Sequence, residues 1–345
     1  MDNVNAFYLG EIFGVCLITT KQDTVLLHTF GVTYMNNFPI VFTHSGCQAY
    51  LKIAIRQTQA FNPESEIILL GDESNEVLKK ICTHFFFKDF SSEADKFKRV
   101  YKPFSNNNVD YEYFCIKRWF LLLGFMKEKE IEWAFVCDTD VLLYCSVSKY
   151  YNQHIAKEYE AAFCIPDQEY SEFRWLASAH TSFISFNFLQ RFCDYILDIY
   201  SSKIETLREK IKFHDKTNLP GGISDMSFFY LYYYYKNRNI FNLSNFADGT
   251  IFNINVDMKD GELNDKIQNN IFHGNLSFSN ERPFTTGNSG QNVFFESLHF
   301  HGGSKYLMLK FYTGNTDLFV FKCKLVVFSK NYIGKLVKLI ESRFK

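Results

Sequence analysis

The chain has 345 residues, of which 47% are hydrophobic, enough for one large domain or two small ones. Its formal net charge of −1 provides no overall field that would favour nucleic acid as a partner. The nine cysteines are scattered without a CxxC pair, which disfavours a zinc site. Four of them lie inside apolar runs and are expected to be reduced core thiols: Cys137, Cys145, Cys164 and Cys193.

The N-terminus has no basic leader before its apolar residues, so we expect no secretory signal. No window reaches the about 18 uninterrupted apolar residues that a membrane-spanning helix needs. The composition therefore favours a cytoplasmic protein.

Taken in chain order, the first elements alternate between strands and helices. We expect strands at 39–43, 66–70 and 83–87, separated by one helix that Ser45 caps and another that begins near Ser74. This β-α-β-α-β order predicts an α/β fold with a parallel sheet and right-handed crossovers.

The later elements continue the alternation, and no internal repeat is present. They are a helix at 111–126, strands at 133–137, 160–166 and 181–186, a helix at 225–235 and a strand at 297–301. The stretch 260–291 is rich in Asn, Gly and Ser, so we expect loops there.

Three regions divide the chain. Residues 1–36 are expected to pack on the core as an N-terminal segment, in which 24–30 fits either a strand or a short helix. Residues 37–310 form the main domain. Residues 311–345 form an extension that ends in a basic amphipathic helix at 331–345. That helix either contacts an anionic membrane surface weakly or, as is more common, packs on its own domain.

The most informative stretch is 133–144, where an apolar run ends in Asp138 and Asp140 and then resumes. A buried strand cannot hold two like charges, so the pair must lie where the strand leaves the sheet. Open α/β sheets bind ligands at that edge. Two carboxylates suit Mn²⁺ or Mg²⁺, which fill their shell with water and substrate phosphates. The alternative is a solvated turn.

This Asp-x-Asp pattern after an apolar strand resembles that of GT-A type nucleotide-sugar glycosyltransferases. The run 298–305 resembles the His-aromatic-x-Gly-x-x-Lys signature of the glycogenin and bacterial galactosyltransferase group. The resemblance implies a Rossmann-like, mostly parallel central sheet flanked by helices. It also implies that His299 is the third metal ligand, that Lys305 holds the diphosphate, and that Gly302 lets backbone approach a phosphate.

His301 competes with His299 because a strand's two-residue period points both side chains to one side. Two loop histidines without a ligand are the alternative to both. The resemblance further implies that Thr43 and His44 bind the base and ribose, with help from Asp72. Each of these three could equally be a capping or turn residue.

Arg118 occupies the helix before the carboxylate strand, where the family often keeps a base that binds the donor. Its guanidinium suits bidentate binding of a diphosphate. His180 and Ser182 stand where the family has an Asn and a Gly that line the sugar. Asp225 matches the Asp of the family's Asp-Gln pair, but Met226 replaces the Gln, which leaves retention or inversion open.

Asp225 is the candidate catalytic residue, either orienting a sugar hydroxyl or acting as a base, and its alternative is a helix N-cap. We therefore expect a metal-dependent hexosyltransferase that moves a sugar from a nucleotide diphosphate, a UDP-sugar, to a glycan, lipid or protein acceptor. A catalytically silent sugar-nucleotide or glycan-binding module is the first alternative. A haloacid-dehalogenase-type phosphatase is the second, disfavoured because three β-α units precede Asp138.

Overall fold

The computed structural model divides the chain into two units, Met1–Met35 and Asn36–Lys345. It describes residues 18–19, 24–25, 37–104, 108–155, 158–219, 222–236, 239–245, 248–252, 255, 258–259, 262–264, 273–287 and 290–314. In the first unit, β1 (Ile18–Thr19) pairs with β2 (Thr24–Val25) in antiparallel register, so 24–25 form a strand. The rest of the stretch 24–30 and the predicted helix at 331–345 lie outside the described residues.

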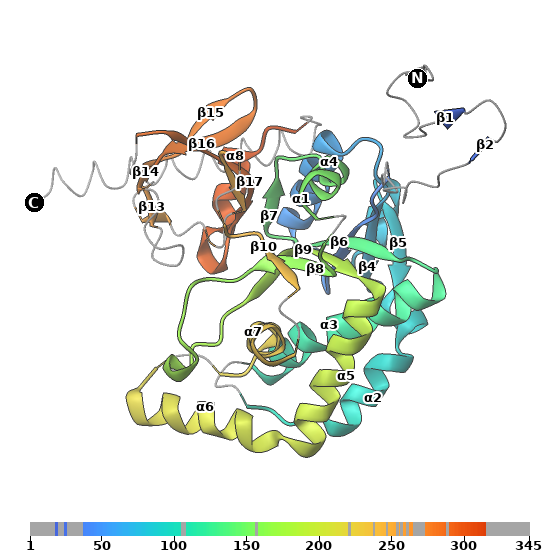
Figure 1. Cartoon of the computed structure of the whole chain (residues 1–345), viewed down its shortest axis with the longest axis vertical. Coiled ribbons are helices and arrows are strands. Elements are labelled where there is room, and N and C mark those ends of the chain that lie inside the picture. The colour runs from blue at the N-terminus through green and yellow to red at the C-terminus, as the bar shows by residue number, and fades with distance from the viewer. Residues whose placement is uncertain are drawn as a thin grey trace, which may run out of the picture. The chain divides into compact units, whose positions relative to one another are not determined.

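A seven-stranded sheet is the centre of the second unit, with strand order β10-β8-β9-β6-β3-β4-β5 (Figure 1). β9 runs antiparallel to both of its neighbours, and the other neighbouring pairs are parallel. The expected mostly parallel α/β sheet is thus confirmed. The bounds are β3 (Ile40–Thr43), β4 (Ile67–Gly71), β5 (Thr83–Phe86), β6 (Trp133–Cys137), β8 (Ala161–Cys164), β9 (Ser178–Ser185) and β10 (Ile240–Asn242).

Helices cover both faces of this sheet (Figure 1). Alternate strand residues such as Val41 and Val136 join a core with α3, α5 and α7, while Phe135 and Phe183 point to the face that carries α1 and α4. The helices are α1 (Ala49–Phe61), α2 (Ser92–Val100), α3 (Val109–Glu128), α4 (Val147–His154), α5 (Phe186–Ser202), α6 (Ile204–Thr217), α7 (Asp225–Tyr235) and α8 (Met308–Phe311). None of the described helices is long and apolar enough to cross a membrane.

A second sheet is built around the late strand β17 (Asn292–His299), in the order β11-β17-β16-β15. β7 (Val141–Leu143), which directly follows the two aspartates, leaves the central sheet and pairs antiparallel with β17. The remaining strands are β11 (Thr250–Phe252), β15 (Ser277–Ser279) and β16 (Arg282–Thr286), and, in a third small sheet, β12 (Met258–Lys259), β13 (Glu262–Asn264) and β14 (His273–Asn275).

The expectation of loops over 260–291 is therefore wrong in its described part. The turn between β15 and β16 explains why. Asn280 and Glu281 both adopt positive φ, at 49° and 63°, the two-residue geometry that matches the twist of a hairpin. The turn-forming composition thus marks tight connections between short strands.

Two other local expectations are corrected. The helix expected near Ser74 is a single 3₁₀ turn, η1 (Glu76–Lys80). Ser45 does not cap α1, because the N-cap is Gln48 and the Ser45 hydroxyl donates instead to Asp72 at 2.7 Å. The other 3₁₀ turns are η2 (Phe87–Phe90), η3 (Tyr170–Glu172) and η4 (Gly302–Leu307).

Candidate functional site

The turn that carries Asp138 and Asp140 connects the central sheet to the second sheet, which is built around β17. β6 ends at Cys137, and the Asp138 amide donates to the His180 carbonyl on β9 at 2.7 Å. β7 then pairs with β17, so that the Phe300 amide donates to the Asp140 carbonyl at 2.8 Å. The aspartates therefore lie at the carboxyl end of β6. The end of β17, a strand from much later in the chain, lies beside them.

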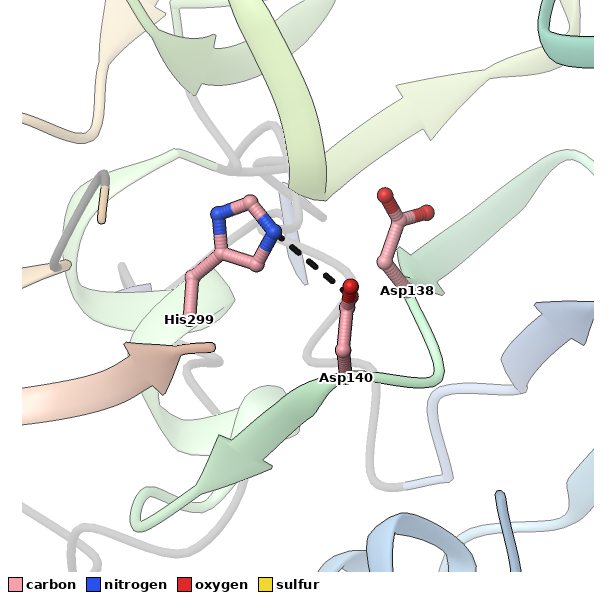
Figure 2. A group of neighbouring side chains, drawn as sticks. All are labelled: Asp138, Asp140 and His299. Atoms are coloured by element: carbon pink, nitrogen blue, oxygen red, sulfur yellow. Dashed lines mark ion pairs between the residues drawn. The ribbon is translucent and has the colours of Figure 1, made fainter. Parts of the chain in front are cut away.

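Three potential ligands converge at this junction (Figure 2). Asp138, Asp140 and His299 each offer one ligand atom, and these atoms all lie within 4.8 Å of one another. His299 Nε2 lies 3.5 Å from an Asp140 carboxylate oxygen. Two carboxylates and an imidazole at this spacing form a donor set that could hold one divalent cation.

His301 follows the end of β17 and lies before η4. Its backbone is extended, with φ −67° and ψ 144°, and the residue is exposed. The His299 and His301 rings lie 6.1 Å apart at an interplanar angle of 74°.

Lys305 pairs with the other oxygen of the same carboxylate. Its Nζ lies 3.0 Å from Asp140 Oδ2 and 5.1 Å from the centre of the Tyr50 ring. Burial raises the pKa of Asp140, but His299 and Lys305 outweigh burial and lower it below its usual value. Burial lowers the pKa of Lys305, and Asp140 raises it above its usual value. Both groups are therefore charged near neutral pH. The sequence analysis did not single out Tyr50, because an aromatic residue in an apolar helical pattern carries no signal of a binding site.

Arg118 connects the candidate metal centre to Asp225. Its two Nη atoms bond to Asp138 and, at 2.8 Å, to Asp225 Oδ2. Trp119 Nε1 donates to the same Asp225 oxygen at 3.0 Å. Ser224 is the N-cap residue of α7, and Asp225, in the first turn, accepts the Met226 amide through Oδ1 at 3.0 Å.

Burial and neighbouring charges act in opposite directions on the pKa values of Arg118 and Asp138. Burial alone would lower the pKa of Arg118, but Asp138 and Asp225 raise it well above its usual value. Burial raises the pKa of Asp138, and Arg118 offsets only part of that rise. A cation beside Asp138 therefore favours its ionised form.

The residues predicted to hold the nucleoside surround the other side of the turn. Thr43 ends β3 and is buried, and His44 Nδ1 lies 3.0 Å from the Thr139 hydroxyl. Asp72 accepts bonds from the Ser45 hydroxyl and the Gly46 amide, at 2.7 and 2.9 Å. It therefore fixes the loop after β3.

Two more predicted residues occupy contrasting environments. Gly302 has a φ of +55°, and a Cβ added there would meet no atom within 4 Å, so its backbone is accessible. His180 is only 1% exposed. Its ring is stacked on that of His299, with centroids 4.3 Å apart and an interplanar angle of 12°. His180 therefore lies beside a candidate ligand rather than on an open surface.

No protein-family model matches the chain, and no curated protein matches it either. Among solved structures, mouse xyloside xylosyltransferase 1 is similar at 11% identity and a TM-score of 0.41, over 62% of this chain and 88% of that one. PaToxG glycosyltransferase is similar at 12% identity and a TM-score of 0.34, over 58% of this chain and 70% of that one. The glycosyltransferase GlyE of Streptococcus pneumoniae TIGR4 is similar at 12% identity and a TM-score of 0.30, over 60% of this chain and 45% of that one. The function proposed below therefore rests on the residues of the candidate site alone.

Proposed function

We propose that the protein is a metal-dependent glycosyltransferase that moves a sugar from a UDP-sugar to a glycan, lipid or protein acceptor. The observation that carries this proposal is the convergence of Asp138, Asp140 and His299, with Lys305 beside them, at the carboxyl end of β6. Carboxylates and an imidazole for a cation, together with an ammonium group for an anion, suit a ligand that carries a diphosphate.

The leaving diphosphate gains charge as the glycosidic bond breaks. A divalent cation held by Asp138, Asp140 and His299 would stabilise that charge. Lys305 would donate to a diphosphate oxygen, an interaction that strengthens in the transition state and therefore raises turnover. Its ion pair with Asp140 keeps the ammonium group charged and in place until the donor binds.

The remaining residues would position the sugar and the nucleoside. Asp225 would orient a hydroxyl of the donor or acceptor, or act as a base, from the start of α7. Arg118 holds Asp225 and Asp138 in a fixed relation and would present its charge to the diphosphate. Thr43 and His44 would bind the base and ribose, and Gly302 would let backbone approach a phosphate.

Calorimetry with UDP, with and without Mn²⁺, followed by a screen of sugar-nucleotide hydrolysis and transfer, tests the proposal. We expect UDP binding that needs Mn²⁺ and turnover that EDTA stops. Asp140→Asn keeps the shape of the side chain and should lower turnover by about 100-fold or more. Asp89→Asn, at an exposed carboxylate on η2, is the matched control.

Each alternative function predicts a different result. Mn²⁺-dependent UDP binding without turnover of any donor would identify a silent binding module. Hydrolysis of phosphate monoesters without sugar transfer would identify a phosphatase. Full transferase activity in excess EDTA would remove the metal from the mechanism. The anomeric configuration of the product, read by NMR, assigns retention or inversion.

A further inference from the structure

His180 contacts both halves of the candidate metal centre. Its backbone carbonyl accepts the Asp138 amide at 2.7 Å, which fixes the point where β6 ends. Its imidazole is stacked on that of His299 at 4.3 Å. One residue of β9 therefore contacts a carboxylate ligand through its backbone and the imidazole ligand through its side chain.

These contacts join two different sheets. β9 belongs to the central sheet, where Thr181 pairs with Cys137 of β6. His299 belongs to β17 in the second sheet, where it pairs with Val141 of β7. The relative position of the carboxylates and the imidazole thus depends on how the two sheets meet. The stacked rings lie at that meeting point.

The orientation of His180 is itself fixed. The Ser178 hydroxyl lies 2.8 Å from His180 Nδ1, and the His180 side chain is almost completely buried. A buried ring held by a hydrogen bond offers His299 a flat surface of fixed direction. Such a surface restricts rotation of the His299 ring about its own side-chain bonds, which keeps Nε2 toward Asp140.

We propose that His180 is a positioning residue, which sets the plane of the His299 imidazole and so sets the metal affinity of the site. This inference rests on the proposed function, because it takes Asp138, Asp140 and His299 as metal ligands. Residues that orient a ligand commonly change metal affinity by about 10- to 100-fold when they are replaced. His180 would act in this way without touching the metal or the donor.

A positioning role and a simple packing role predict different responses to substitution. If His180 only fills space, an apolar side chain of similar bulk should serve whether it is flat or not. If it orients His299, a flat ring is needed. His180→Phe keeps the flat ring but loses the bond to Ser178, whereas His180→Leu fills the site without a flat face. Ser178→Ala keeps the ring and removes the hydrogen bond to its Nδ1.

The experiment measures the Mn²⁺ affinity of the full chain by electron paramagnetic resonance of free Mn²⁺, without donor, and thermal unfolding in EDTA. We expect the Kd of His180→Leu to rise by about 10- to 100-fold. The Kd of His180→Phe should stay within about 3-fold of wild type, although both variants lose a similar amount of thermal stability. Ser178→Ala, which also keeps a flat ring and loses that bond, should likewise stay within about 3-fold of wild type. If His180→Leu does not fold, His180→Met, which also lacks a flat face, is measured in its place, and its Kd should rise by about 10- to 100-fold.

Two outcomes would overturn the inference in distinguishable ways. Wild type that binds Mn²⁺ with the same Kd as His180→Leu, or equal weakening in the Phe and Leu variants, would remove the positioning role and leave the proposed function intact. Wild type that shows no Mn²⁺ binding, with or without UDP, would remove both the metal site and this inference.

Discussion

At the scale of single residues, charge balance around Arg118 determines the state of the site. Asp138 and Asp225 come from distant segments and are both largely buried, and the guanidinium lies between them. Removing one partner of such a network is costly, because it leaves a buried charge without compensation. Arg118 is therefore expected to matter for folding as well as for the reaction.

Arg118→Ala should lower the free energy of unfolding by about 3 kcal/mol, since it leaves two carboxylates facing each other without a cation. Arg118→Lys should lower the free energy of unfolding by less, because the ammonium group keeps the charge. Some loss is still expected, because an ammonium group cannot bridge both carboxylates with a planar fork. Urea unfolding at pH 7 measures both, with Arg99→Ala at an exposed position of α2 as the control. Equal stability of all three variants would contradict the bridge.

Lys305→Ala should separate turnover from metal binding. The variant loses the charge that would face the leaving diphosphate, so kcat should fall by about 100-fold. Mn²⁺ affinity should be unchanged or higher, because the ammonium group no longer competes with the metal for Asp140. Steady-state kinetics measure the fall in kcat, and a Mn²⁺ titration measures the metal affinity. A fall in Mn²⁺ affinity that accounts for the whole loss of turnover would count against the diphosphate role.

At the scale of elements, the segment that carries Lys305 is held at both ends. Before η4, Phe300 bonds to the Asp140 carbonyl. After α8, the fully buried Gln57 of α1 accepts the amides of Thr313 and Gly314, at 3.1 and 2.9 Å. The position of Lys305 therefore follows from the packing of η4 and α8 between these anchors.

Gly124→Ala tests the packing of α3, the helix that carries Arg118. Alanine would favour the helix by about 1 kcal/mol. Its Cβ, however, would lie 2.6 Å from the Phe90 carbonyl oxygen of η2, so the two elements would have to move apart. Overpacking of this kind costs about 1–3 kcal/mol. We expect net destabilisation in thermal unfolding, whereas Lys127→Ala, on the exposed face of α3, should be nearly neutral. A stabilised Gly124→Ala protein would show that the contact is loose.

At the scale of the whole molecule, local patterns predicted what depends on neighbours in sequence. Apolar runs and helical periods gave the sheet, and burial of like charge placed Asp138 and Asp140 at a strand end. The resemblance implied one pairing between distant segments, that of His299 with the two aspartates. Other such pairings were missed, because nothing local in the sequence specifies them. The departure of β7 from the central sheet, the bridge through Arg118 and the stack of His180 on His299 all arise from such pairings.

One buried lysine links three parts of the molecule and makes the stability of the fold depend on pH. Lys210 of α6 is 2% exposed, and its Nζ donates to the Arg174 carbonyl at 2.8 Å and to the Ser227 hydroxyl of α7 at 3.0 Å. Burial lowers the pKa of Lys210 to about 7, against a smaller opposing effect of Glu112 on α3. The folded chain thus releases this proton well below the pH at which the unfolded chain does.

Between the folded pKa of about 7 and the ordinary lysine value near 10.5, the unfolded chain binds one more proton than the folded chain at this site. The free energy of unfolding must therefore rise with pH across that window. From pH 7 to pH 9, this site should add about 2 kcal/mol. Lys210→Met, which cannot titrate, should lack that increment, whereas Lys216→Met, at an exposed lysine of the same helix, should keep it. Urea unfolding of the three proteins at both pH values measures the difference, in which all other titrating groups cancel. Parallel changes in wild type and Lys210→Met would mean that Lys210 stays charged in the folded protein.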